Sequence, residues 1–353
     1  MSSLLLLWWT SIALAAAALA CMSTLLVGRL FREQSYARRA RDRDRACEAF
    51  FDVMNGSGDA LGRLRVVDHR ARLMGEAVLE FLAMVRGVER DRLITALRTI
   101  NMDERWRRCL FKGRIAGRMV AAEALSIFPS PETVSALREA LNQTRSGNLR
   151  VALMRSLIEL DAAPPLAQVL QDIHRNSGSE TLLYIPLMGR LVNGDTRAAL
   201  RAFGDPATPP RARVILAEAL GTSGDFRALR PLCAAAAAPD IELRIASVRG
   251  LAAMGHPAAE ARILTALQDP VWMVRSAACE AAGRIGLRAA VPLIIIQLSD
   301  PVWWVRFRAG EALSALGPTG VRGLQAAAAG PGDLSRRAAS LALAERGLAM
   351  TAA

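Results

Sequence analysis

Apolar residues recur at three- and four-residue spacings along most of the chain. The clearest example runs from Val302 to Leu316, where one apolar stripe consists of Val305, Ala309, Ala312, Leu313 and Leu316. This spacing predicts an amphipathic helix that buries one face. The apolar segment before it, Ala289 to Leu298, predicts a first, shorter helix. The pattern therefore indicates a unit of two helices.

Residues at the ends of the second helix have the types that cap helices. We expect Asp300 to be its N-cap and Pro301 its first residue, where a missing N–H costs nothing. Gly317 is expected to take the left-handed conformation that ends many helices. Inside the helix, Gly310 and the alanines near it predict a close approach of neighbouring helices.

The same unit recurs with a period of 31 residues. Asp269-Pro-Val-Trp-Met-Val-Arg275 aligns without gaps with Asp300-Pro-Val-Trp-Trp-Val-Arg306. An arginine followed eleven residues later by a glycine marks four consecutive units: Arg213 and Gly224, Arg244 and Gly255, Arg275 and Gly286, Arg306 and Gly317. A fixed period of roughly 20–50 residues is typical of solenoids.

The 31-residue spacing becomes less regular towards both ends of the array. One step forward reaches Arg337, with Gly347 one position early. Upstream, Arg118 and Arg150 begin similar segments, whereas Leu182 stands where the next arginine is expected. We therefore expect about eight units between Gly113 and Gly347.

The chain before the array is also expected to be helical. Asp68–Gly87 and Glu89–Met102 have amphipathic spacing, and Asn55 to Gly58 has the composition of a turn. The expected core positions are Leu73, Ala77, Leu79, Leu82, Leu93, Ala96 and Leu97. A terminal unit must cover an otherwise exposed apolar face, so we interpret residues 47–112 as a cap on the stack.

The pattern D-P-x-x-x-V-R-x-x-A-x-x-A-L-x-x-L-G, read from Asp300 to Gly317, resembles short bacterial HEAT repeats, including those of phycobilin lyase subunits. The resemblance covers residues 113–353. It implies an all-α solenoid that presents an extended surface to another macromolecule. Membrane-anchored bacterial proteins similar to this whole architecture accompany glycosyltransferases, so the resemblance also implies a membrane-associated enzyme of that kind as a partner.

A different pattern occupies residues 1–28. Leu4 to Val27 contains no charged residue and would span roughly 36 Å as a helix, more than the roughly 30 Å hydrocarbon core of a bilayer. Arginines crowd the following segment, 29–46, and no basic residue precedes the apolar run. The positive-inside rule then predicts a single-pass inner-membrane protein with its N-terminus outside and its repeats, 113–353, in the cytoplasm. A cleaved signal peptide, or a lipoprotein acylated at Cys21, is the alternative.

Composition and charge narrow the class of protein. Hydrophobic residues make up 52% of the chain but aromatics only 5%, because Ala and Leu dominate, and these favour helices over strands. The net charge is +12. The cysteines, Cys21, Cys47, Cys109, Cys233 and Cys279, form no CxxC pair, which argues against a zinc site or a disulfide framework.

Three tryptophans and a methionine form a candidate partner-binding strip. Trp272 and Trp303 occupy the same repeat position, with Met273 and Trp304 beside them. The core positions are already filled by the valines that follow, so these side chains are expected at the surface, where aromatic patches mark interaction sites. The alternative is that the indoles fold down over the preceding turn.

The recurrent arginines form a second candidate set: Arg213, Arg244, Arg275, Arg306 and Arg337. We interpret them as a structural ladder in which each arginine pairs with the N-cap aspartate of its own or the neighbouring repeat. Arg306, for example, is expected to pair with Asp269 or Asp300. Ligand binding is the alternative.

A basic run near the start of the array is the third candidate: Arg105, Arg107, Arg108, Lys112, Arg114 and Arg118. Trp106 is interleaved, as in many nucleic-acid-binding surfaces. The nearby anchor favours anionic lipid or an acidic partner over DNA. An ordinary solvated helix face is the alternative.

Catalytic and metal-binding patterns are missing from the sequence. The three histidines, His69, His174 and His256, have no partner at metal-ligand spacing, and no phosphate-binding loop, hydrolase or dinucleotide motif occurs. We therefore predict a membrane-anchored scaffold or adaptor for a protein partner, without enzyme activity, cofactor or metal. A lyase or chaperone-lyase and a nucleic-acid-binding solenoid are the alternatives.

Overall fold

A computed structural model describes residues 8–9, 19–24, 26, 29, 40–57, 59–66, 71–175 and 183–347. These residues are helical or lie in turns, and none of them is in a β-strand. The chain divides into two compact units, Met1–Asp161 and Ala162–Ala353.

The first unit is a stack of helices built around a small aromatic core. Residues 40–54 are helical. The helices that follow are α2 (Ala60–Val66), α3 (Ala71–Met84), α4 (Val88–Thr99), α5 (Met102–Cys109), α6 (Ile115–Leu125), α7 (Pro131–Gln143) and α8 (Gly147–Glu159). Helix α6 packs against α3, α5 and α8. Trp106, which is fully buried, tilts against Phe128 with ring centroids 5.6 Å apart.

Three of the four core positions predicted on α3 are wrong. Ala77 is buried as expected, but Leu73, Leu79 and Leu82 are only half-buried. The fully buried positions are the neighbouring Met74, Val78 and Phe81. The buried positions of α3 recur at three- and four-residue spacings and so form one helix face, which the prediction did not follow. The predicted core positions in α4, Leu93, Ala96 and Leu97, are buried, as expected.

The second unit consists of two-helix repeats, as the 31-residue period predicts. Its α-helices are α9 (Leu166–Arg175), α10 (Tyr184–Gly194), α11 (Thr196–Gly204), α12 (Pro210–Thr222), α13 (Leu229–Ala235), α14 (Ile241–Met254), α15 (Glu260–Ala266), α16 (Trp272–Ile285), α17 (Val291–Gln297), α18 (Trp303–Ala315), α19 (Pro318–Ala329) and α20 (Asp333–Glu345). Short 3-10 turns, η2 (Phe226–Ala228), η3 (Pro257–Ala259) and η4 (Arg288–Ala290), precede α13, α15 and α17.

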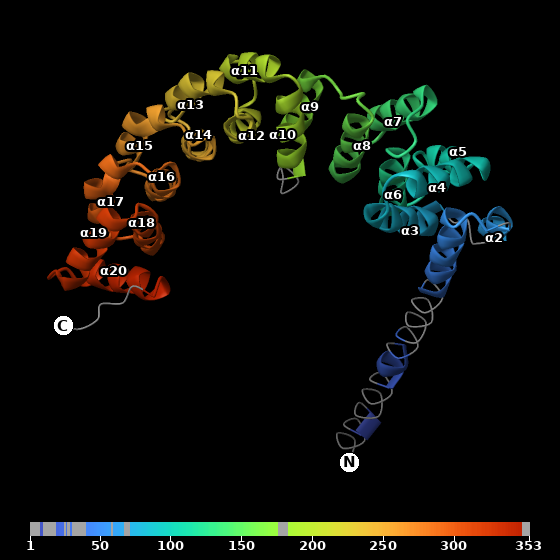
Figure 1. Ribbon diagram of the computed structural model, residues 1–353, viewed down its shortest axis with the longest axis horizontal. Coiled ribbons are helices and arrows are strands. Elements are labelled where there is room, and N and C mark those ends of the chain that lie inside the picture. Colours follow the sequence, from blue (N-terminus) through green and yellow to red (C-terminus); the bar gives the residue numbers. More distant parts are fainter. Residues whose placement is uncertain are drawn as a thin grey trace. The chain divides into compact units, whose positions relative to one another are not determined.

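The helices of the second unit lie in two rows (Figure 1). The first helices of the repeats, α11, α13, α15, α17 and α19, form one row, and the second helices, α12, α14, α16, α18 and α20, form the other. Each second helix packs on the next, from α12 through to α20. This contact requires small residues: a Cβ added at Gly310 would lie 2.8 Å from the Cβ of Ala342. The predicted close approach at Gly310 is confirmed.

Glycines stand at the predicted repeat ends, and Gly255 and Gly286 take the predicted left-handed C-cap conformation. The prediction is wrong for Gly317, whose φ of 71° comes with a ψ of −151° and which is the N-cap of α19. Gly224, Gly255, Gly286, Gly317 and Gly347 all have positive φ, between 63° and 82°. Eleven residues after Arg150, Asp161 takes the same left-handed conformation with φ of 54°. Aspartate adopts this region more readily than most residues, so the repeat period extends to a position where the sequence carries no glycine.

The predicted N-cap at Asp300 is wrong by two residues. Helix α18 begins at Trp303 with Val302 as its N-cap. The Asp300 carboxylate instead accepts a hydrogen bond of 2.8 Å from the Val302 N–H, within the turn before the helix. Asp269 accepts the equivalent 2.8 Å bond from Val271. The aspartate therefore caps a turn, and Pro301 precedes the helix.

Most of the predicted membrane anchor, Leu4 to Val27, lies outside the described residues. Among the residues that the structure describes, none belongs to a helix long and apolar enough to cross a membrane.

Candidate partner-binding surface

The recurrent arginines connect successive repeats through a fixed set of bonds. Arg275 Nη1 donates to the carbonyls of Asp269 and Pro270, at 2.8 and 3.1 Å. Its Nε and Nη2 lie 2.8 and 2.7 Å from Oδ2 of Asp300, in the next repeat. Arg244 is paired in the same way with Asp269, its Nε 3.0 Å from the carboxylate. These two arginines thus have the structural role expected of the ladder.

The other ladder arginines do not form this pair with an aspartate of the next repeat. The residue 25 positions after Arg213 is Ala238, and Arg213 lies over the Phe203 ring instead, 5.9 Å from its centroid. Arg337 pairs with Asp333 in its own helix at 2.8 Å and is largely exposed. Arg306 bonds to the carbonyl oxygens of Asp300 and Pro301, at 2.7 and 3.0 Å, and not to the Asp300 carboxylate.

The predicted aromatic strip resolves into one compact cluster at the start of α18. The Trp303 and Trp304 rings meet edge to face, with centroids 4.7 Å apart, and Trp303 stacks on Phe307 at 5.1 Å. Trp304 also meets the edge of the Phe307 ring at 6.2 Å. Sequence reasoning missed Phe307, although its position four residues after Trp303 places it on the same helix face.

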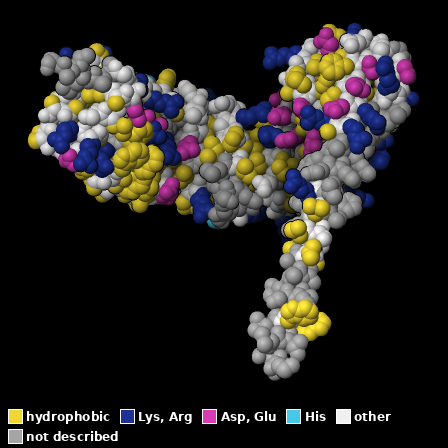
Figure 2. All heavy atoms as spheres, turned by 90° about the horizontal axis from the view of Figure 1, so that it is seen from below, with side chains coloured by type: hydrophobic (Ala, Val, Ile, Leu, Met, Phe, Trp, Pro, Cys, Tyr) yellow, Lys and Arg dark blue, Asp and Glu magenta, His cyan; other side chains and the backbone are white. Residues whose placement is uncertain are grey.

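The tryptophans of the strip are exposed to different degrees. Trp304 is 51% exposed, Trp303 47% and Trp272 37%, whereas Met273 is half-buried. Within the described part of the chain, Trp272 has no ring contact with the α18 cluster. The space-filling view shows apolar side chains gathered on the C-terminal repeats with arginines beside them (Figure 2).

A groove lies beside the aromatic cluster, between α18 and α20. It encloses about 270 Å³ and is lined by Trp303, Arg306, Phe307, Leu334, Arg337, Ala338, Leu341, Ala342 and Glu345. Leu334 and Leu341 are each 43% exposed. Large apolar side chains therefore remain open to solvent on both walls of the groove, with charged groups among them.

Half of the side chains in the basic run on α5 and after it form ion pairs or hydrogen bonds within the fold. Arg107 forms an ion pair with Asp103 at 2.9 Å, and Arg108 pairs with Glu104. Arg118 donates to the Leu110 carbonyl. Arg105, Lys112 and Arg114 lie at the exposed surface. Trp106 is a core residue, so the run lacks the accessible aromatic ring of a nucleic-acid-binding surface.

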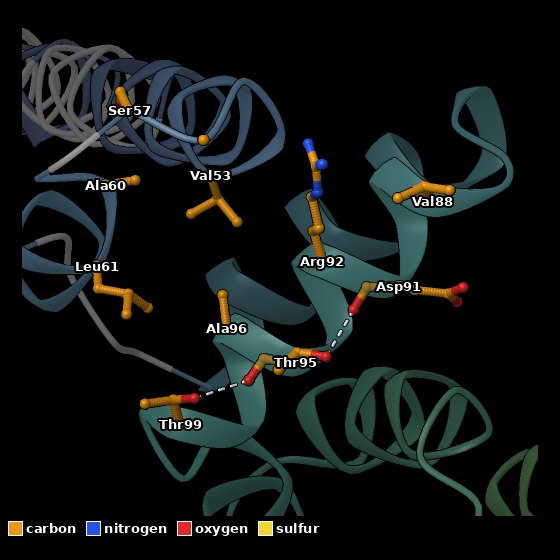
Figure 3. A pocket seen from close by; sticks show the side chains of 11 residues that line it. Val53, Ser57, Ala60, Leu61, Val88, Asp91, Arg92, Thr95, Ala96 and Thr99 are labelled. Atoms are coloured by element: carbon orange, nitrogen blue, oxygen red, sulfur yellow. Dashed lines mark hydrogen bonds between the residues drawn. The ribbon is translucent and has the colours of Figure 1, made fainter.

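A second cavity, of about 480 Å³, opens in the first unit beside α4. Figure 3 shows Thr95 and Thr99 on its wall, each with its hydroxyl donating to a carbonyl of the same helix, at 2.8 and 2.9 Å. Arg92 extends towards the neighbouring helix and donates to the Met54 carbonyl at 3.0 Å. These polar groups serve the backbone of the fold and do not converge on a common point in the cavity.

Residues able to act as nucleophiles or metal ligands are dispersed. Among the described residues, no group of three or more His, Cys, Asp or Glu side chains could hold a metal ion. Burial, with the nearby Asp300 carboxylate adding to it, raises the pKa of Cys279 to about 12, so its reactive thiolate is scarce at neutral pH. His256 caps η3 by accepting from the Ala258 N–H. His69 lies outside the described residues.

Comparison with known proteins supports the repeat assignment. A family model described as HEAT repeats matches residues 229–314 and 260–344, from α13 into α20. These segments are HEAT repeats. The karyopherin Kap121p bound to the extreme C-terminus of the protein phosphatase Cdc14p is similar in structure, with a TM-score of 0.50 at 12% identity over 86% of this chain and 43% of that chain. Kap121p bound to Pho4p gives a TM-score of 0.51 at 12% identity over 87% and 43%.

These likenesses establish the fold, an all-helical HEAT-repeat solenoid. The chain spans less than half the length of Kap121p. No curated protein matches the chain in sequence.

Proposed function

We propose that this chain is a scaffold or adaptor that binds a protein partner through the aromatic cluster Trp303, Trp304 and Phe307. The observation that carries the proposal is the position of these rings. They contact one another at the start of α18, while both indoles remain about half exposed. Tryptophan is enriched among the residues that dominate binding energy at protein interfaces, and a rigid aromatic group loses little entropy when it is covered.

The fold supports protein binding as the general role. Kap121p, which shares the HEAT-repeat fold, is seen bound to Pho4p and to the C-terminus of Cdc14p. Solenoids present long surfaces because each repeat contacts only its neighbours. We infer a binding role and not a catalytic one, because Arg92, Thr95 and Thr99 in the cavity beside α4 donate their hydrogen bonds to backbone carbonyls.

Replacing Trp304 with alanine is expected to weaken partner binding at least tenfold, because an exposed indole of the cluster is lost. Quantitative affinity capture from detergent-solubilised membranes, followed by titration of the captured protein, measures this change. Trp304→Ala should leave thermal unfolding nearly unchanged, since the indole is half exposed.

Ile296→Ala is the matched control. Ile296 is a large apolar side chain, 64% exposed, on α17 in the other row of helices. Its loss should not affect capture if the aromatic cluster is the site. Equal partner recovery by wild type and Trp304→Ala would contradict the proposal, and equal loss in both variants would indicate a nonspecific hydrophobic surface.

We further propose that residues 4–27 hold the repeats at the cytoplasmic face of the inner membrane, as the arginine asymmetry around this segment favours. The resemblance of the whole architecture, an apolar N-terminal segment followed by repeats, to membrane-anchored bacterial proteins that accompany glycosyltransferases supports a membrane-associated enzyme of that kind as the partner.

In intact spheroplasts, we expect added protease to leave the repeats undigested and to degrade them once the membrane is permeabilised. Digestion of the repeats in intact spheroplasts would refute the proposed orientation. Recovery of the protein in the supernatant after carbonate washing of membranes would refute the anchor itself.

A further inference from the structure

The ladder arginines have two edges with separate partners. At Arg244, Arg275 and Arg306, Nη1 donates to two carbonyl oxygens in the turn before the arginine's own helix. At Arg244 and Arg275, the other edge, formed by Nε and Nη2, binds an aspartate 25 residues further along the chain. The backbone contacts thus hold each guanidinium so that its second edge faces the next repeat.

Arg306 retains the backbone contacts and lacks the carboxylate. The position 25 residues after it is Pro331, where the two preceding steps of the ladder have Asp269 and Asp300. The aspartate nearest to Pro331 in sequence is Asp333, which pairs with Arg336 and Arg337 at 2.8 Å each. Within the part of the chain that the structure describes, Arg306 forms no ion pair.

Arg306 lines the groove between α18 and α20. The charged groups that line this groove are Arg306, Arg337 and Glu345, and Arg337 is already paired with Asp333. The volume of about 270 Å³ is below the roughly 300–1,000 Å³ of sites for small organic ligands. It suits one or two side chains of a polypeptide.

We propose that this groove binds a segment of a protein partner that presents an aspartate or glutamate to Arg306. A carboxylate there would complete the interrupted ladder, as Asp300 does for Arg275, through a charge-assisted pair of N–H···O bonds. An apolar side chain next to the acid would pack on Trp303 and Phe307, which line the same groove. This inference rests on the proposed function and specifies the chemistry of the partner.

The chain itself supplies a probe for this site. Residues 297–304 contain Asp300 with its neighbours, the segment that occupies the equivalent position at Arg275. A fluorescein-labelled peptide of this sequence, titrated with the full chain in detergent, should bind at least tenfold more tightly than the same peptide with asparagine in place of its aspartate. Fluorescence anisotropy measures both affinities, and higher salt should weaken only the aspartate peptide.

Arg306→Gln is expected to abolish the difference in affinity between the two peptides. In a double-mutant cycle, this loss would show that the peptide carboxylate pairs with the Arg306 guanidinium. Arg322→Gln is the matched control. Arg322 is exposed on the adjacent helix α19, and its replacement removes the same charge without touching the groove. The control should retain the tenfold difference.

Three results of the peptide titrations would overturn the inference. These are no binding of the aspartate peptide, equal binding of both peptides, and loss of discrimination in Arg322→Gln as well. Binding only after removal of residues 348–353 would assign the groove to the chain's own terminus and overturn the partner assignment. If Trp304→Ala abolishes partner capture while Arg306→Gln leaves it intact, the proposed function stands and this inference fails.

Discussion

Asp300→Ala is expected to lower the free energy of unfolding by about 3–5 kcal/mol, the range measured when one member of a buried ion pair is removed. The Asp300 side chain is 4% exposed and that of Arg275 is 15% exposed. Without the carboxylate, the Arg275 guanidinium keeps its hydrogen bonds to two backbone carbonyls. Its positive charge, however, is then largely shielded from water and has no counter-charge. The Val302 N–H also loses its acceptor.

Urea denaturation followed by circular dichroism measures this loss as a shift of the transition midpoint. Asp300→Asn separates the ion pair with Arg275 from the hydrogen bond with Val302, because the amide oxygen can still accept from the Val302 N–H while the charge is gone. Asp333→Ala is the control for surface pairs. Its carboxylate is 54% exposed and pairs with two arginines of its own helix, so its loss should cost less than about 1 kcal/mol. Comparable losses in Asp300→Ala and Asp333→Ala would show that the inter-repeat pair contributes no more than a surface pair.

Gly221→Ala should destabilise the protein by about 2–3 kcal/mol, because an added methyl group would overlap the backbone of the neighbouring helix. In this second unit, α12 and α14 pack so closely that a Cβ at Gly221 would overlap the Cα of Gly250. A Cβ at Gly250 would in turn lie 2.7 Å from the Ala217 carbonyl oxygen. Backbone atoms cannot rotate away, so the two helices must separate.

The control for this prediction is Gly189→Ala. Gly189 lies inside α10, and a Cβ there would meet no atom within 4 Å. Alanine has the higher helix propensity, so this variant is expected to be unchanged or more stable by up to about 1 kcal/mol. Thermal unfolding of the two variants distinguishes packing from propensity. A Gly221→Ala protein as stable as wild type would show that α12 and α14 can move apart at little cost.

The local features of this protein follow from its sequence. The 31-residue period, the two-helix unit, the glycine C-caps of α14 and α16 and the buried stripe Val305, Ala309, Ala312, Leu313 and Leu316 were all predicted, and all are present. Helix periodicity and left-handed backbone conformations depend on residues close together in the chain. For the same reason, the candidate cluster was partly foreseen, because Trp303 occupies the same repeat position as Trp272 and the valines that follow fill the core.

Contacts between repeats were decided only by the tertiary structure. The sequence predicted that each ladder arginine pairs with an aspartate of its own or the neighbouring repeat, without deciding which. Packing of α16 on α18 brings Arg275 to Asp300 of the next repeat, and Pro331 stands where Arg306 would need the equivalent carboxylate. Helix packing likewise selected the buried face of α3 and buried Trp106. Such contacts depend on the orientation of neighbouring helices. That orientation results from many weak interactions between residues far apart in the chain, so no local pattern of residues records it.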